Sequence, residues 1–226
     1  YSIMDRNVVL NGDCLDLIND IDTGSIDMVL CDLPYGVTKN KWDSVIDLNS
    51  LWIHYKRVLK KGGIVILFGQ DKFSARVMLS NEKWHRYNLI WEKTSPTGFY
   101  NARKMPLRSH EDMMIFYESL PVYNPQKTTG HERKVSTAMH KRNSKMSSNY
   151  GDAELSSYDS TERYPKSVWR FATDKQKSAI HPTQKPVKLL SEIIKTYTNV
   201  GDLVLDNCSG SGSTAVACIE TGRDYY

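Results

Sequence analysis

Residues 26–35 read Ile-Asp-Met-Val-Leu-Cys-Asp-Leu-Pro-Tyr, an apolar run that ends in a carboxylate, a proline and an aromatic side chain. A short, nearly continuous apolar run of this kind predicts a strand that is buried on both faces of a sheet. Similar runs recur along the chain, around residues 7–10, 64–68, 88–91, 113–117 and 203–205. The chain therefore carries several candidate strands for one central sheet.

Two segments between these runs have the spacing of amphipathic helices. Apolar side chains repeat every three or four positions over residues 48–59, and a Lys-Lys-Gly-Gly stop follows. The pattern returns over residues 187–197, directly after Pro186. Buried strands that alternate with such helices predict an α/β fold with a mainly parallel sheet covered on both faces.

Length and composition fit one well-filled core with a smaller appendage. The chain has 226 residues, of which 40% are hydrophobic and 25% charged. A mean hydropathy of −0.50 and the lack of a long apolar run exclude a membrane-spanning class. The first residues lack the layout of a secretory signal, so we expect a cytoplasmic protein. The four cysteines form no CxxC pair, which predicts neither a disulfide framework nor a metal site.

Positive charge gathers in the middle of the chain. The whole sequence has a net charge of +4, whereas residues 93–146 carry ten Lys or Arg and only four acids. A basic middle on a mildly acidic frame is typical of nucleic-acid binding, although a solvated surface has the same appearance. Within it, residues 124–165 hold few apolar side chains and no Ile, Phe or Trp. We expect this polar segment to be an insertion outside the core, mobile when free or ordered by a partner.

Four short sequences lie where an open parallel sheet binds ligands, beyond the carboxyl ends of strands or at helix starts. Taken alone, each has an ordinary structural reading as a turn, a glycine bend or a helix cap. The four are Asp32-Leu-Pro-Tyr35, Asp206-Asn-Cys-Ser-Gly-Ser-Gly-Ser-Thr214, His181-Pro-Thr-Gln-Lys-Pro186 and Gly12-Asp13-Cys14. The glycines at 210 and 212 would let the backbone approach a ligand closely.

In this order, these motifs resemble the β-group of amino-directed DNA methyltransferases. The family carries a [D/N/S]PP[Y/F/W] catalytic motif early, a target-recognition insertion in the middle and a DPFxGSGTT cofactor loop late. The resemblance implies a three-layer Rossmann-like methyltransferase fold with a circularly permuted motif order and a polar insertion for target recognition. It implies that residues 1–122 are the catalytic half, 123–166 the partly mobile insertion and 167–226 the cofactor half.

The resemblance also implies the chemistry. Members transfer a methyl group from S-adenosylmethionine to the amine of a base flipped out of double-stranded DNA. The Asp32 carboxylate and the Leu33 carbonyl would accept from that amine, Pro34 would hold their geometry and Tyr35 would stack on the base. Leu33 replaces the family's proline, but its carbonyl can still act. No metal is required.

Cofactor residues carry over from the same motifs. They are Asp13, Cys14, Asp32, Thr183, Gln184, Lys185, Asp206, Cys208, Gly210, Gly212 and Ser213. The sequence departs from the family at Asn207-Cys208, where the loop has Pro-Phe, and the family's ribose-binding acid would lie beyond Tyr226.

DNA contacts are expected from the basic middle. The candidates are Asn101, Arg103, Arg108, Lys134, Lys141 and Arg142. An Asp at the head of the catalytic motif favours adenine N6 as the target, with cytosine N4 as the alternative. An RNA adenine methyltransferase and a catalytically inactive DNA-binding subunit are further readings. No membrane partner is expected, and the sequence leaves a homodimer open.

Overall fold

The computed structural model describes residues 5–36, 46–137, 157–173 and 184–226 of the chain. They form two compact units, one made of Tyr1–Asn124 with Ser167–Tyr226 and the other of Pro125–Lys166. The helices are α1 (Cys14–Leu17), α2 (Leu48–Val58), α3 (Asp71–Ser80), α5 (Val187–Tyr197) and α6 (Ser213–Thr221), with 3-10 turns η1 (Ile18–Asp20) and η2 (Phe99–Asn101). The strands are β1 (Ile26–Cys31), β2 (Leu59–Gly69), β3 (His85–Thr97), β4 (Arg108–Phe116), β5 (Lys134–Ser136), β6 (Tyr158–Ser160), β7 (Val168–Phe171), β8 (Leu203–Leu205) and β9 (Asp224–Tyr225).

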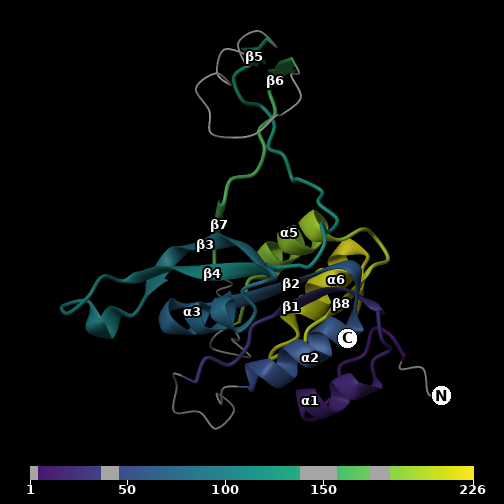
Figure 1. Ribbon diagram of the computed structural model, residues 1–226. Helices are drawn as coiled ribbons and strands as arrows, with labels where there is room; N and C mark the ends of the chain where they lie inside the picture. The colour runs from purple at the N-terminus through teal and green to yellow at the C-terminus, as the bar shows by residue number, and fades with distance from the viewer. Residues whose placement is uncertain (1–4, 37–45, 138–156, 174–183) are drawn as a thin grey trace. The chain divides into compact units, whose positions relative to one another are not determined.

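The first unit is built on a seven-stranded sheet in the order β7-β3-β4-β2-β1-β8-β9 (Figure 1). Strand β1 pairs in parallel with β2 and β8, β9 continues in parallel from β8, and β7 is parallel to β3. Strand β4 is antiparallel to both β2 and β3. The sheet is therefore mainly parallel, as the continuous apolar runs predict.

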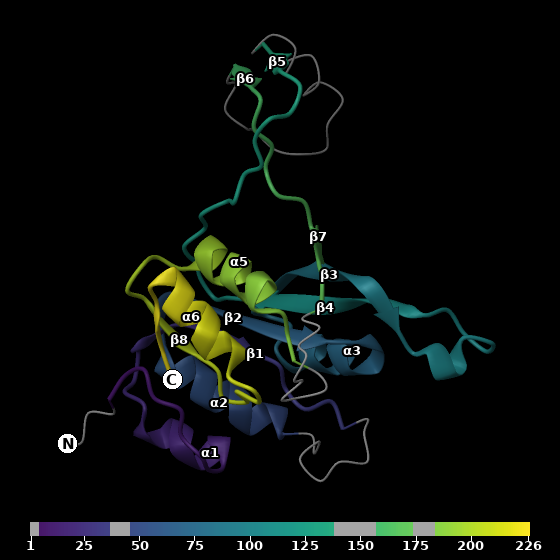
Figure 2. The ribbon, with the colours of Figure 1, turned by 180° about the vertical axis from the view of Figure 1, so that it is seen from behind.

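Helices cover both faces of this sheet, with α5 and α6 on one side and α2 and α3 on the other (Figures 1 and 2). Consecutive residues of β1 point to opposite faces: Val29 packs in the core layer with Trp52 of α2, and Met28 packs in the layer with Ile194 of α5. The three-layer α/β architecture expected from the sequence is confirmed. Among the described residues, no helix is long and apolar enough to cross a membrane.

One expectation about secondary structure was wrong, and one helix was not expected. Residues 7–10 form no strand. Asn7 bonds to the edge strand β9 through its N–H, which donates to the Tyr225 carbonyl at 2.9 Å, and through its side chain, which contacts Asp224 and the Tyr225 N–H. The apolar side chains that follow line a pocket instead. Helix α3 was missed, although Phe73 and Val77 are buried at helical spacing, because its other positions are mostly polar.

The second unit, Pro125–Lys166, has its own small antiparallel pair, β5 with β6. Arg133 forms a two-pronged contact to the Asp159 carboxylate, at 2.7 and 2.6 Å. Thr128 and Arg163 form a further antiparallel bridge. The role of this second unit in target recognition stays a prediction.

Candidate active site

The carboxyl ends of β1 and β8 bring two of the sequence motifs together. The strands are parallel, with Val29 opposite Leu205, so Asp32 and Asp206 follow their strands at the same edge of the sheet. Their proximity is also electrostatic, because the charge of Asp32 helps to raise the pKa of Asp206. The carboxylate corner and the start of the glycine-rich loop therefore lie at the same edge of the sheet.

The Asp32 carboxylate is held at both of its oxygens. The Lys185 ammonium lies 2.7 Å from Oδ2, and the Tyr35 hydroxyl donates to Oδ1 at 3.0 Å. The aspartate side chain is 27% exposed while that of Lys185 is 9% exposed. The carboxylate can therefore meet an incoming group from solvent although a cation anchors it from inside the protein.

Two charged residues that the sequence reading missed continue this contact into the sheet. Glu111 of β4 contacts Lys185 at 2.9 Å and Lys93 of β3 at 2.6 Å. Its signal in the sequence was an acid two positions ahead of the apolar run that begins at Met113. Negative and positive side chains alternate along these contacts, in the order Asp32, Lys185, Glu111 and Lys93. We call these four residues the ionic row.

The other members of the catalytic motif pack around Asp32. The Leu33 side chain is buried, so its contribution to chemistry would come from the backbone. The Tyr35 ring stacks on Phe73, with ring centroids 4.6 Å apart. Burial raises the pKa of Tyr35 well above its usual value, so the phenol is neutral and acts as a donor.

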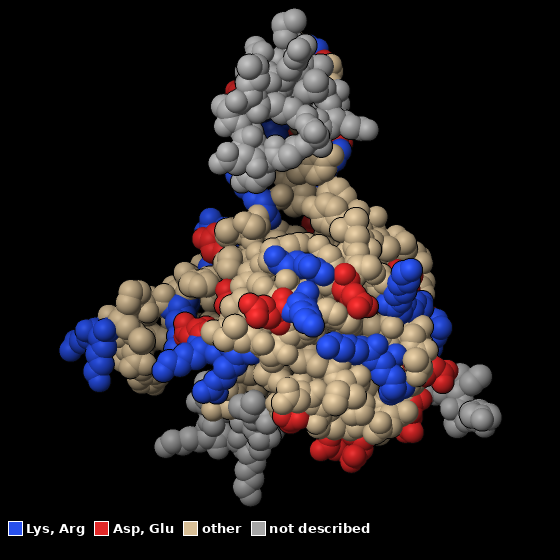
Figure 3. Space-filling view, viewed as in Figure 1, with Lys and Arg blue, Asp and Glu red and all other residues tan. Residues whose placement is uncertain are grey.

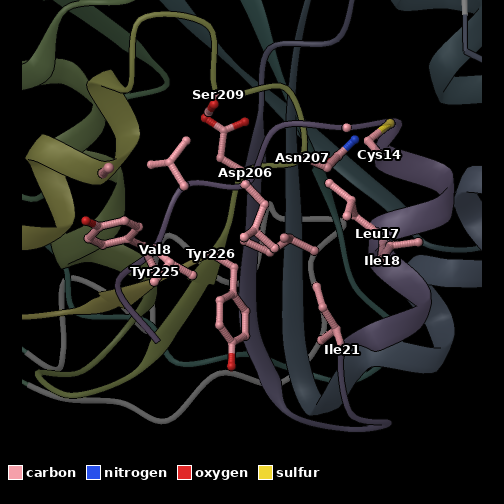
Figure 4. A pocket seen from close by; sticks show the side chains of 15 residues that line it. Val8, Cys14, Leu17, Ile18, Ile21, Asp206, Asn207, Ser209, Tyr225 and Tyr226 are labelled. Atoms are coloured by element: carbon pink, nitrogen blue, oxygen red, sulfur yellow. The ribbon is translucent and has the colours of Figure 1, made fainter. Parts of the chain in front are cut away.

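A pocket opens beside the glycine-rich loop (Figure 4). It is lined by the chain ahead of α1, by α1 and η1, by the β8–α6 loop and by the end of the chain. The lining residues are Val8, Val9, Leu10, Gly12, Cys14, Leu17, Ile18, Ile21, Leu205, Asp206, Asn207, Ser209, Ala215, Tyr225 and Tyr226. A mostly apolar wall with a few polar groups suits a ligand that has both a flat ring and charged ends.

Asp206 supplies the negative charge of this pocket. Burial raises the pKa of its carboxyl to about 6, although hydrogen bonds from the Thr214 hydroxyl and the Cys208 N–H oppose the rise. Among the residues that the structure describes, Asp206 forms no ion pair, and a ligand with a positive charge would provide a partner. This donor set fits S-adenosylmethionine, which carries a sulfonium and an ammonium.

Backbone geometry explains the glycines of the loop. Gly210 and Gly212 have φ of +50° and +78°, a conformation that costs other residues about 1–2 kcal/mol. Gly212 caps α6, and the next residue, Ser213, is buried. The Ser211 and Ser213 hydroxyls lie 3.0 Å apart. The loop thus turns tightly between strand and helix beside the pocket.

The acid of the Gly12-Asp13-Cys14 motif has a structural role. Asp13 caps α1, where its carboxylate accepts from the Leu15 N–H at 2.9 Å. Cys14 lines the pocket next to it. Gln184 is half-buried, whereas Thr183 lies outside the described residues. The cofactor roles given to these residues stay predictions.

Comparison with known proteins follows the same lines as the geometry. The N6/N4 DNA methylase family model matches residues 26–226. The chain belongs to this family. It is 28% identical to the type II methyltransferase M2.MboI of Moraxella bovis, over 98% of this chain and 82% of that protein. It is 25% identical to the DNA adenine methyltransferase YhdJ of Escherichia coli K12, over 98% of this chain and 77% of that one.

Among solved structures, the methylase resembles the M1.HpyAVI complex with S-adenosylmethionine. The TM-score is 0.62 at 19% identity, over 95% of this chain and 88% of that one. A likeness at this identity supports the shared fold, and the family match supports the classification as a DNA methylase.

The methylase carries its DNA-binding candidates in different places. Asn101 and Arg103 lie at the tip of the hairpin between β3 and β4, which projects beyond the helices (Figures 1 and 2). Arg108 begins β4 and pairs with Asp71 at 3.4 Å. Lys134 lies in the second unit, and Lys141 and Arg142 lie outside the described residues.

The tip of the β3–β4 hairpin carries exposed aromatic side chains as well as cations. Phe99 is 82% exposed and Tyr100 is fully exposed. The tip therefore presents aromatic rings beside cations, a combination that the sequence reading did not single out.

Several cations of the basic middle are already paired. Lys93 is buried against Glu111, Lys127 contacts Glu162 at 3.1 Å and Arg133 contacts Asp159. Lys93 cannot reach a phosphate, which corrects the expectation that the whole basic stretch contacts DNA. Figure 3 shows Lys and Arg side chains at the end of the β3–β4 hairpin, at the left of the view.

Proposed function

We propose that this DNA methylase transfers the methyl group of S-adenosylmethionine to the N6 amine of an adenine that is rotated out of duplex DNA. The observation that carries the proposal is the Asp32 carboxylate, anchored at Oδ2, 27% exposed, and at the same sheet edge as Asp206. The Asp that opens the motif and the name of the relative YhdJ both favour adenine. Cytosine N4 is the second candidate, because the same acceptors suit either amine.

The chain's own groups would act by holding the amine. An exocyclic amine is a poor nucleophile because its lone pair is delocalised into the ring. Acceptance of its N–H bonds by Asp32 Oδ1 and by the Leu33 carbonyl would favour a pyramidal nitrogen whose lone pair faces the methyl group. Alignment of this kind removes much of the entropic barrier.

The cofactor would lie in the pocket next to this site. S-adenosylmethionine supplies an activated methyl group on its sulfonium. Asp206 would pair with its positive charge, and Cys14 and Ser209 are polar groups on the same pocket wall. The turn at Gly210 and Gly212 would let backbone approach the methionine part.

The test is methyl transfer followed by sequencing. The purified protein with tritiated S-adenosylmethionine should label duplex DNA, and modification-sensitive sequencing should find N6-methyladenine at one short motif. N4-methylcytosine at that motif would support the second candidate. A cofactor that raises the melting temperature while no label enters any DNA would instead show an inactive DNA-binding subunit.

Cofactor affinity should depend on pH through Asp206. In the free protein this carboxyl has a pKa of about 6, and a bound cation favours its charged form. Binding then releases a proton, so the dissociation constant should rise by up to about tenfold per pH unit below pH 6. Calorimetric titration from pH 5 to 8 measures this slope. The Asp206→Asn variant should bind more weakly at pH 8 and show little slope; a wild-type affinity that is flat across the range would contradict the assignment.

Tyr35 should contribute through its ring and not through its hydroxyl. Stacking on a base is worth roughly 1–3 kcal/mol, so Tyr35→Ala should lower kcat/KM by about 5- to 150-fold. Tyr35→Phe keeps the ring and frees Asp32 Oδ1 from its present donor, so its kcat should stay within about threefold of wild type. Steady-state kinetics with a melting curve for each variant measures both, and equal losses in the two variants would argue against stacking.

A further inference from the structure

We infer that Glu111 is a positioning residue for the Asp32 carboxylate, that it acts through Lys185, and that Lys93 holds Glu111 in place. The inference rests on the proposed function of Asp32 as the acceptor for the target amine. It assigns a role in catalysis to two residues on β3 and β4 that carry none of the recognised motifs.

The first step concerns the two oxygens of Asp32, which have different contacts. Lys185 holds Oδ2 at 2.7 Å, while the Tyr35 hydroxyl donates to Oδ1 at 3.0 Å. The hydroxyl sits on a side chain of the same short loop and can be exchanged for an incoming N–H. Oδ2 is thus the anchored oxygen and Oδ1 is the one available to the amine.

The second step is what holds the anchor. A lysine side chain is a flexible four-carbon stem, and its ammonium stays in one place only when its surroundings fix it. The Lys185 side chain is 9% exposed, and the rings of Phe68 and Tyr35 lie 5.1 and 5.9 Å from its Nζ. The groups of opposite charge that face it are Asp32 and Glu111. Glu111 therefore fixes the position from which Lys185 reaches Asp32.

The third step is the fixation of Glu111 itself. It is carried by β4 in the middle of the sheet, where it lies opposite Trp91 of β3. Lys93 contacts its Oε1 at 2.6 Å, and the Lys93 ammonium also lies 5.2 Å from the Trp91 ring. Lys93 and Glu111, both on strands of the sheet, thus fix one end of the ionic row. Through Lys185 they hold the position of Asp32, which lies in the loop after β1.

Charge balance agrees with this arrangement. Burial by itself would raise the pKa of Glu111, but Lys185 and Lys93 outweigh it and the pKa is lowered. Burial likewise opposes the charge of Lys185, but Asp32 and Glu111 raise its pKa. Glu111 and Lys185 are therefore both charged near neutral pH. Lys185 forms two buried ion pairs. Buried ion pairs are weak evidence for stability, so the ionic row is better explained by the placement of the Asp32 carboxylate.

The test uses Glu111→Gln in single-turnover methyl transfer with saturating DNA and cofactor. We expect the rate to fall by about 10- to 100-fold, within the range that misplacement of a catalytic group produces. The dissociation constants for DNA and for S-adenosylmethionine should change by less than about threefold. Glu111→Asp, which keeps the charge on a shorter stem, should recover part of the lost rate.

A second variant separates placement from loss of stability. Glu111→Gln leaves two buried cations facing one acid, which can impair folding. The double variant Lys93→Met with Glu111→Leu removes one charge of each sign, leaves the Lys185–Asp32 pair balanced and should fold. It should still be slow, because Lys185 has lost its second anchor. The control is Thr221→Val, which removes a buried hydrogen bond in α6, from the Thr221 hydroxyl to the Ala217 carbonyl at 2.7 Å, away from the ionic row.

The pH profile is the readout that a merely structural role would not move. Without Glu111, the acid that still faces Lys185 in the described part of the chain is Asp32, beside the neutral Tyr35 phenol, and burial then favours loss of the Lys185 proton. The rate of Glu111→Gln should decline at a lower alkaline pH than that of wild type, whereas Thr221→Val should keep the wild-type profile. A wild-type rate and profile in Glu111→Gln, or in the double variant, would overturn the inference. A wild-type enzyme that transfers no methyl group would instead overturn the proposed function.

Discussion

Replacing Asp32 with alanine should lower the rate of methyl transfer by about 10³-fold or more, while the affinity for S-adenosylmethionine stays within about threefold. The variant removes the proposed acceptor, whose Oδ1 would face the target amine, and such groups contribute roughly 10²- to 10⁴-fold. The cofactor pocket keeps its own carboxylate, Asp206, because that side chain is carried by a different strand end. Tritium transfer under single-turnover conditions and calorimetric cofactor binding measure the two quantities.

Asp32→Asn provides the matched control for shape. The amide keeps the size of the side chain and one acceptor oxygen, but it loses the charge that Lys185 holds at 2.7 Å. Its rate should lie between those of wild type and Asp32→Ala. Turnover by Asp32→Ala close to that of wild type would show that a different carboxylate serves the amine, and Asp206 would then be the first to examine.

Binding to non-specific DNA should fall steeply with salt, and the tip of the β3–β4 hairpin should account for part of that slope. Cations that contact phosphates release counterions, and each contact adds about −0.9 to the slope of log K against log salt. With a slope of about −3 or steeper, affinity would drop on the order of 60-fold or more between 50 and 200 mM salt. Fluorescence anisotropy with a labelled duplex measures the slope.

Arg103→Ala with Lys104→Ala should make that slope shallower by about 2, since both side chains are exposed at the tip and have no ion pair among the described residues. The matched control is Lys83→Ala with Lys195→Ala, which removes two exposed cations elsewhere. Phe99→Ala with Tyr100→Ala should weaken binding without changing the slope, because aromatic stacking releases no counterions. A wild-type slope near zero would refute the electrostatic role of the basic middle.

Much of the fold could be predicted from local patterns. Residues 26–31 and 203–205 form β1 and β8 within the expected bounds, and residues 187–197 form α5. These segments are buried on all sides or along one clear stripe, so their apolar spacing carries the information. Residues 7–10 misled because an apolar run can line a pocket as well as fill a sheet. Helix α3 was not expected because most of its positions are polar, so its short apolar stripe was not recognised.

The candidate site could be predicted only where its residues are consecutive. Asp32 to Tyr35 and Asp206 to Ser213 were recognisable because short motifs at strand ends have a limited set of uses. Lys93 and Glu111 were not, because each stands alone in its own strand and gains its meaning from the partner across the sheet. The exposed pair Phe99 and Tyr100 could have been noticed beside Arg103 and Lys104, as aromatic residues interleaved with cations.

By itself, the sequence determined the alternation of buried strands and amphipathic helices, the family and the two loops that carry its recognisable motifs, since each of these depends on neighbours along the chain. The tertiary structure alone decided that Lys185 faces Asp32 and not solvent, that Glu111 and Lys93 stand behind it, and that Lys93 is lost to DNA binding. The physical reason is that the ionic row joins side chains from β3, from β4, from the loop after β1 and from the segment before α5. Charges so distant in sequence meet only when the sheet has formed and excluded the water between them.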